Sequence, residues 1–137
     1  MNEELPANSD GQHTNSASLR LATGPLVGPV LCRVVSMVLA RANCPMNRLD
    51  DAMLICDALS AHAPEHVQDG QLSFALSARS GGFELRLGEL PERAGMQLVQ
   101  ASVVPGVGNV LERMTDELRI EPAADGVYEE LVLKLRF

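Results

Sequence analysis

Two alternating runs joined by a glycine turn constrain the fold of this chain more than any other feature. Apolar and polar residues alternate through Leu72–Arg79, and the same two-residue period returns in Phe83–Leu87. This period places the apolar side chains on one face of a strand. The intervening Ser80, Gly81 and Gly82 suit a tight turn between paired strands. The sequence therefore predicts an antiparallel hairpin with one apolar face.

The flanking segments supply further strands and the helices that can cover this face. Ser18–Thr23, Leu118–Glu121 and Leu131–Phe137 alternate like strands, whereas Pro29–Ala42 and Asn47–His62 carry apolar residues at helical spacing. Because each strand has a single apolar face, we expect the helices to lie on one side of the sheet. The predicted fold class is α/β: a two-layer sandwich with helices on one face of a mixed, largely antiparallel sheet.

Two helix-boundary signals and two shorter helices complete the expected order of elements. Asn47 is a favourable N-cap for the second helix, and Pro64 should end it near His62. Pro91–Ser102 is expected to form a short helix, and Gly106–Thr115 another.

The composition favours one domain with a polar N-terminal tail. A chain of 137 residues suits a single domain, predicted to span residues 18–137. Residues 1–17 contain almost no apolar side chains and are expected to form a flexible tail. The net charge is −7, with no cluster of Lys or Arg, which argues against nucleic acid and anionic membranes as partners. The sequence has neither an apolar span nor a signal peptide, so a cytoplasmic protein is expected.

The cysteines and histidines predict no metal site. Cys32, Cys44 and Cys56 are odd in number and twelve residues apart, and in apolar helical surroundings they should pack as small hydrophobic residues. His62 and His66 are four residues apart like a zinc pair, but the intervening proline should break the helix that would align them.

A glycine pair before a helix is the one feature that suggests a ligand. Gly106 and Gly108 precede Val110, Leu111 and Met114, which share one helical face. Such a loop leaves backbone N–H groups free at the positive end of the helix dipole, where phosphate groups often bind.

This segment, followed by Asp116-Glu117-Leu118 at the start of a strand, resembles the last conserved box of the GHKL ATPases. The resemblance is closest to the anti-sigma-factor serine kinases and covers about Leu19–Phe137. It implies a GHKL ATPase-like domain in which Gly106 and Gly108 contact a nucleotide.

The two other boxes of that family are altered here. The resembled kinases carry a catalytic Glu on the second helix and, four residues later, an Asn that binds magnesium. Asp57 falls at the first position, as a candidate catalytic residue or alternatively a solvated or capping carboxylate, and Ala61 falls at the second. Ala61 has no oxygen to offer a metal. The Asp that contacts adenine falls on Gly88 or Glu89, which makes Glu89 a candidate nucleotide contact.

The leading hypothesis is a regulatory binding protein resembling an anti-sigma factor, with lost or weak ATP binding and no expected cofactor. The resemblance implies a sigma factor or an anti-anti-sigma protein as its partner, and a possible homodimer. The alternative is an ATP-dependent serine/threonine kinase acting on an anti-anti-sigma protein. It would use ATP and magnesium, with Asp57 as base and Glu89 at the adenine. A third possibility is a pocket for another small ligand.

Overall fold

The chain folds into a five-stranded sheet with helices on one side of it. The structure is a computed structural model and describes residues 14–67 and 69–137. Its elements are β1 (Asn15–Ala22), α1 (Val27–Arg41), α2 (Met46–His62), the 3-10 helix η2 (Ala63–His66), β2 (Gln71–Arg79), β3 (Gly82–Leu90), α3 (Ala94–Ala101), β4 (Val103–Val104), β5 (Gly108–Asn109), α4 (Val110–Met114), β6 (Glu117–Pro122) and β7 (Glu129–Arg136).

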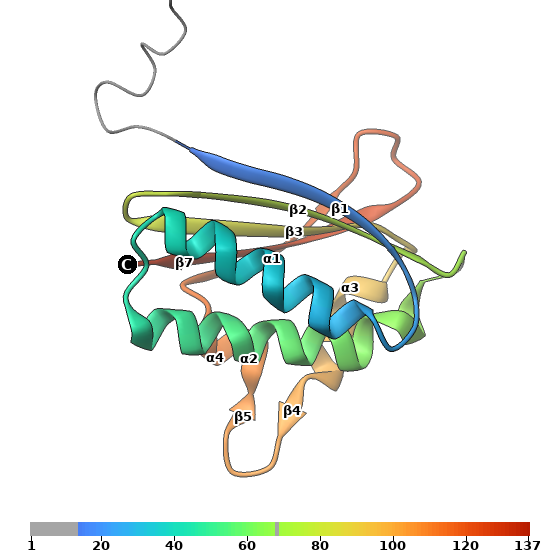
Figure 1. Cartoon of the computed structure of the whole chain (residues 1–137). Helices are drawn as coiled ribbons and strands as arrows, with labels where there is room; N and C mark the ends of the chain where they lie inside the picture. Colours follow the sequence, from blue (N-terminus) through green and yellow to red (C-terminus); the bar gives the residue numbers. More distant parts are fainter. Residues whose placement is uncertain (1–13, 68) are drawn as a thin grey trace, which may run out of the picture.

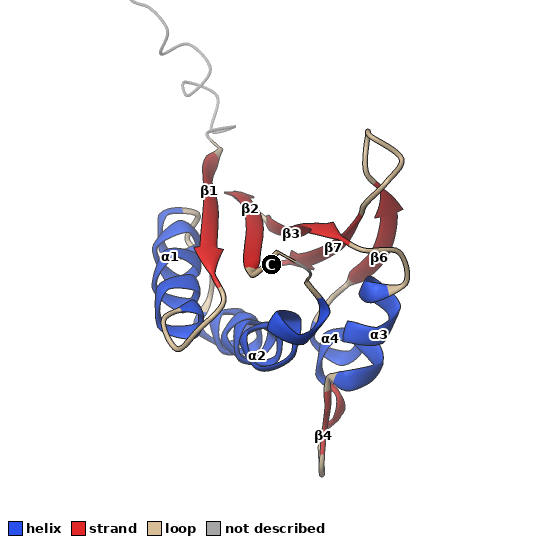
Figure 2. Cartoon of the chain, turned by 90° about the vertical axis from the view of Figure 1, so that its right-hand side faces the viewer, coloured by secondary structure: helices blue, strands red, loops and turns tan. Residues whose placement is uncertain are grey.

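The sheet order confirms the predicted sandwich. The strands lie in the order β1-β2-β3-β7-β6, and every neighbouring pair runs antiparallel. Figure 1 shows the helices below this sheet, and Figure 2 shows them along one side of it. The described sheet is wholly antiparallel, where the sequence predicted a mixed, largely antiparallel one. β4 and β5 form a separate two-stranded sheet.

The β2–β3 hairpin forms where the sequence predicts it. Arg79 pairs with Gly82, so Ser80 and Gly81 make a two-residue turn. Gly81 has a φ of 93°, a left-handed conformation that side chains disfavour and glycine adopts freely.

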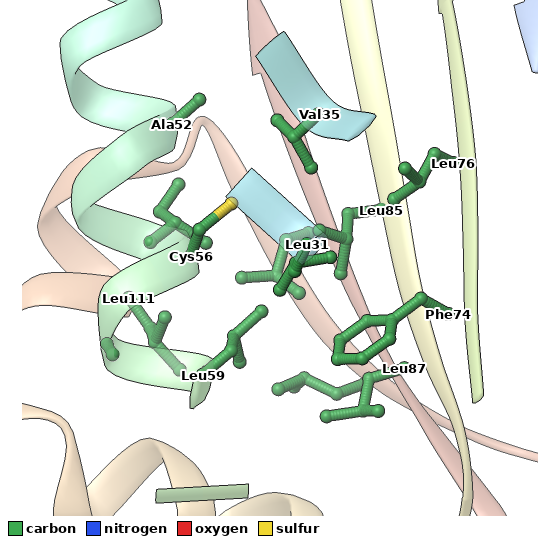
Figure 3. Packing of buried hydrophobic residues seen from close by; sticks show 14 of the residues in the cluster. Leu31, Val35, Ala52, Cys56, Leu59, Phe74, Leu76, Leu85, Leu87 and Leu111 are labelled. Atoms are coloured by element: carbon green, nitrogen blue, oxygen red, sulfur yellow. The ribbon is translucent and has the colours of Figure 1, made fainter. Parts of the chain in front are cut away.

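The core lies between the sheet and the helices. Alternate strand residues point into it, and leucines from α1, α2, α3 and α4 meet them; Figure 3 shows part of this packing. The largest fully buried side chains are Leu31, Leu39, Ile55, Leu59, Leu72, Leu85, Leu87, Leu90, Leu98, Leu111, Leu131 and Leu133. The aliphatic residues that alternate in the sequence therefore form one continuous core, as expected.

The start of α2 differs by one residue from the prediction. Pro45, in an extended conformation, occupies the N-cap position, and its carbonyl accepts hydrogen bonds from Arg48 N at 3.1 Å and Leu49 N at 3.0 Å. Asn47, the expected N-cap, thus lies inside the first turn. The helix ends at His62 as predicted, and a single 3-10 turn follows it.

The first strand begins earlier than predicted. Asn15 pairs with Ala78 and Ala17 with Leu76, so residues 15–17 belong to β1 and not to a flexible tail. Main-chain pairing with β2 orders this segment. Because the segment has few apolar side chains, its sequence did not indicate a strand. The remainder of the expected tail, residues 1–13, lies outside the described residues. Within the described part of the chain, no helix is both long enough and apolar enough to cross a membrane.

Candidate functional site

Gly106 and Gly108 lie in a β-hairpin that projects from the helical layer (Figure 1). Gly106 has a φ of 84° and Gly108 a φ of 93°. Val107 N donates to Val104 O at 3.0 Å and closes the turn. Both glycines therefore serve the hairpin, since each adopts a backbone conformation that L side chains disfavour.

The helix after this hairpin is shorter than the predicted Gly106–Thr115. It covers only Val110–Met114, because the residues before it continue the hairpin and not the helix. Its first turn is already capped: Asn109 Oδ1 accepts from Glu112 N at 3.1 Å. The amide of the same Asn109 donates to Val99 O at 2.7 Å. A side chain of the protein thus occupies the N-terminus at which a phosphate was expected.

Asp57 lies on the outer surface of the helical layer. Its side chain is exposed, and Oδ1 accepts a weak hydrogen bond from Cys32 Sγ on α1 at 3.9 Å. Ala61, one turn further along α2, is exposed as well. This face of α2 offers the carboxylate of Asp57. At the position where the resembled kinases carry a magnesium-binding Asn, Ala61 supplies no amide oxygen.

Glu89 lies at the other side of the sheet. It has a φ of 60° and sits at an irregularity in the pairing of β3 with β7. Arg20 Nη1 and Nη2 donate to its two carboxylate oxygens at 2.9 and 3.2 Å. Arg20 also donates to Ser73 Oγ at 3.0 Å, and the pair lies on the face of the sheet opposite the described helices.

The predicted site residues do not converge on one pocket. Asp57 faces outward between α1 and α2, Glu89 pairs across the open face of the sheet, and Gly106 and Gly108 lie in the projecting hairpin. The sheet separates Glu89 from the other three residues.

The described histidines form no metal site. His62 belongs to α2 and His66 to the 3-10 turn after it, and the His66 Nε2 atom is buried without a hydrogen-bond partner. Across residues 14–67 and 69–137, no group of three or more His, Cys, Asp or Glu side chains is arranged to hold a metal ion.

A groove that the sequence did not predict lies on the open face of the sheet. It has a volume of about 410 Å³ and runs between β1, β2, β3 and the loop that joins β6 to β7. Its lining includes Arg20, Arg86, Glu89, Tyr128 and Glu130. The alternating polar residues of the strands indicated a polar face of the sheet. They did not indicate that the loop between β6 and β7 would form one side of a groove there.

Three glutamates already form ion pairs with Arg86, the cation at the centre of this face. Arg86 Nε lies 2.7 Å from Glu84 Oε2, and Nη1 lies 3.2 Å from Glu121 Oε1 and 3.0 Å from Glu130 Oε1. Burial alone would raise the pKa of Glu84, but the hydrogen bonds and charges of Arg86 and Lys134 outweigh it and lower that pKa. An anionic ligand in the groove would have to displace these carboxylates from Arg86.

The comparisons with known proteins support the fold. No family model matches the sequence, and no curated protein matches it. Among solved structures, a chain of the crystal structure of the SiaB-SiaC complex from Pseudomonas aeruginosa matches with a TM-score of 0.57. The match covers 88% of this chain and 89% of that chain, at 12% sequence identity. The chain therefore shares its α/β sandwich fold with a protein of very different sequence.

Proposed function

We propose that the chain is a regulatory binding protein of the anti-sigma type, with a GHKL-like fold, a protein partner and no ATP chemistry. The partner class is the one implied by the sequence resemblance, a sigma factor or an anti-anti-sigma protein. The match to a chain from a complex between two proteins supports a protein partner.

The observation that carries this proposal is the hairpin at the expected phosphate loop. A phosphate cradle requires several free backbone N–H groups that point at one anion. Here Val107 N bonds to Val104 O, Val110 N bonds to Ser102 O at 2.9 Å, and Asn109 caps the short helix that follows. These three backbone donors are used within the protein, so the geometry of the segment favours a structural role over phosphate binding.

The same hairpin presents apolar side chains to solvent. Val103 is 57% exposed and Val104 is 41% exposed, and the adjoining Pro105 is exposed too. Apolar residues on a projecting element are typical of contacts with another protein, whose association removes them from water. We expect this hairpin to lie within the partner interface.

The kinase alternative requires one nucleotide to reach Asp57, Glu89 and the glycine pair. Glu89 is paired with Arg20 on the open face, whereas the hairpin lies on the helical side of the sheet. This separation disfavours the kinase and adds support for a binding role.

The test begins with the tagged full-length chain, used to isolate its partner from the native host. The purified partner is then titrated with the wild-type protein and with the double variant Val103→Asp/Val104→Asp. A matched control is Val127→Asp, at a valine 68% exposed in the β6–β7 loop. We expect the double variant to bind at least about tenfold more weakly, which corresponds to about 1.4 kcal/mol, and the control to bind normally.

Two outcomes would contradict the proposal. Equal affinities for the double variant and the wild type would remove the hairpin from the interface. Transfer of labelled phosphate from magnesium-ATP to the isolated partner would establish the kinase alternative. Circular dichroism of each variant checks that the fold is retained before affinities are compared.

A further inference from the structure

Helices α1 and α2 pack closely along a row of side-chain contacts, here called the ladder, in which the α1 residues Gly28 and Ser36 are small. A Cβ atom added to Gly28 would lie 3.4 Å from Ser60 Oγ and 3.5 Å from Ser60 Cβ. Two turns further along α1, Ser36 Oγ lies 3.5 Å from Met53 Sδ. The helices therefore run antiparallel, and Cys32 is the α1 residue midway between these two contacts.

The α2 residue that meets Cys32 on this ladder is Cys56. Cys32 Sγ lies 3.9 Å from Oδ1 of Asp57, the residue that follows Cys56 on α2, so the side chain of Cys32 reaches α2 at this position. Figure 3 shows the Cys56 sulfur directed from α2 towards α1. A disulfide needs Cβ atoms about 3.5–4.5 Å apart. One turn along α1 from Cys32, a Cβ atom added to Gly28 would lie 3.5 Å from Ser60 Cβ, so the two helices approach each other within this range beside the cysteines.

The two cysteines differ in their surroundings. Cys56 is fully buried in the core, whereas Cys32 is partly exposed beside Asp57. The neighbouring Cys56 thiol lowers the pKa of the Cys32 thiol, against the opposing effects of burial and of Asp57. Cys32, together with burial, raises the pKa of Cys56. Cys32 is thus the more accessible thiolate, and Cys56 is a second thiol behind it, the arrangement of a redox-active pair.

We propose that Cys32 and Cys56 form an oxidisable dithiol, a modification site at which a peroxide creates a disulfide between α1 and α2. The Cys32 thiolate attacks one peroxide oxygen, the O–O bond breaks, and Cys32 becomes a sulfenic acid while the released hydroxide takes up a proton to form water. Cys56 Sγ then attacks Cys32 Sγ, the S–O bond breaks, and a second water leaves. Two thiols and one hydrogen peroxide thus yield one disulfide and two waters.

The test treats the full-length protein with a slight molar excess of hydrogen peroxide, then unfolds it and counts its free thiols. The chain has three free cysteines, and we expect the count to fall from three to one. Trypsin separates Cys32, Cys44 and Cys56 into three peptides, residues 21–33, 42–48 and 49–79. Mass spectrometry without reduction should find the first joined to the third, and dithiothreitol should release them.

Matched variants distinguish this pair from unspecific oxidation. Cys44 lies in the loop between the helices and donates only to Pro45 O at 3.5 Å, so Cys44→Ser should still lose two thiols. Cys32→Ser should lose none, and Cys56→Ala should stop at a Cys32 sulfenic acid that dimedone traps. A link through Cys44, a link between two copies of the chain, or retention of all three thiols in the wild type would overturn the proposal.

Discussion

The two faces of the sheet are built from the same strands but are stabilised in different ways. Facing the helices, Leu72, Leu85, Leu87 and Leu133 are at most 1% exposed and pack in a continuous aliphatic core. On the open face, the side chains between them are mainly charged and half-exposed. The covered face is held by close packing, where every lost methylene leaves a cavity. The open face is held by ion pairs that water and salt screen.

Val132 shows how the open face protects an apolar residue without a second layer. It lies on that face, yet it is fully buried. Its cross-strand partners are Arg86 on β3 and Arg119 on β6. Arginine side chains have apolar stems that can cover such a residue while the charged ends remain in water. The network of charges thus contributes packing as well as electrostatics.

The largest expected effect is the loss of a leucine from the covered face. Leu85 is 1% exposed and meets the helices at the centre of the core (Figure 3). Leu85→Ala should lower the free energy of unfolding by about 2–5 kcal/mol, because the cavity cannot close fully. Urea denaturation followed by circular dichroism measures this change. A loss below about 1 kcal/mol would mean that the core is loosely packed and that the contrast between the faces is unfounded.

Two adjacent glutamates allow a sharper comparison. Glu129, the first residue of β7, caps the N-terminus of α3. Its Oε2 accepts a hydrogen bond from Gly95 N at 2.8 Å and its Oε1 accepts one from Arg93 N at 3.3 Å. Glu130 joins the open-face network through Arg86. Glu129→Ala should cost about 1–2 kcal/mol, as the loss of an N-cap does.

The matched Glu130→Ala variant should cost less than about 1 kcal/mol, because Arg86 keeps its other carboxylates. The same denaturation experiment compares the two variants. A larger loss of stability for Glu130→Ala than for Glu129→Ala would contradict this expectation. It would mean that the ion pairs of the open face stabilise the fold more than the capping contacts of Glu129 do.

The open-face ion pairs can also be tested by replacing Arg86 and following the dependence of the effect on pH. Arg86→Met should cost about 1 kcal/mol at neutral pH, because several carboxylates lose a shared cation while the apolar stem is kept. In the wild type the pKa of Glu84 lies below its ordinary value of 4.5, so this carboxylate stabilises the fold above that pH. The contribution is lost as the pH falls through the lowered pKa.

The difference in unfolding free energy between wild type and Arg86→Met should therefore shrink on acidification below about pH 4. It should also shrink in about 1 M salt, where the Debye length is about 3 Å. Denaturation at a series of pH values measures both trends. A difference that stays constant down to pH 3 would show that Arg86 acts only through packing.

The sequence predicts the sheet and its covered face because strand periodicity is a local property. Leu72–Arg79 and Phe83–Leu87 alternate strongly enough to give the hairpin and its turn within a few residues. β4 and β5 have two residues each, too few to show a period, and the sequence predicts a helix over Gly106–Thr115 where the hairpin turn and β5 lie. Pro105 followed by Gly106 was the available signal for a turn at this position.

The candidate site depends on long-range placement that a single sequence does not contain. Glu89 pairs with Arg20 across 69 positions of the chain, and this contact exists only because β1 lies beside β2. Cys32 and Cys56 meet because two helices pack through small residues, while their spacing of 24 positions is uninformative by itself. Residue type predicted which groups could act, but not which of them would meet.

We propose that this chain binds a partner without ATP chemistry, and calorimetric titration with magnesium-ATP is the direct test of whether it binds the nucleotide. Ala61 offers no oxygen to a metal, and Asn109 already caps the helix at the glycine pair. The loss of two charge-assisted contacts, about 3–6 kcal/mol, places any residual dissociation constant near the millimolar range. We expect no measurable binding at micromolar ATP and almost no change in melting temperature. A dissociation constant below about 50 μM, with a matching rise in melting temperature, would contradict it.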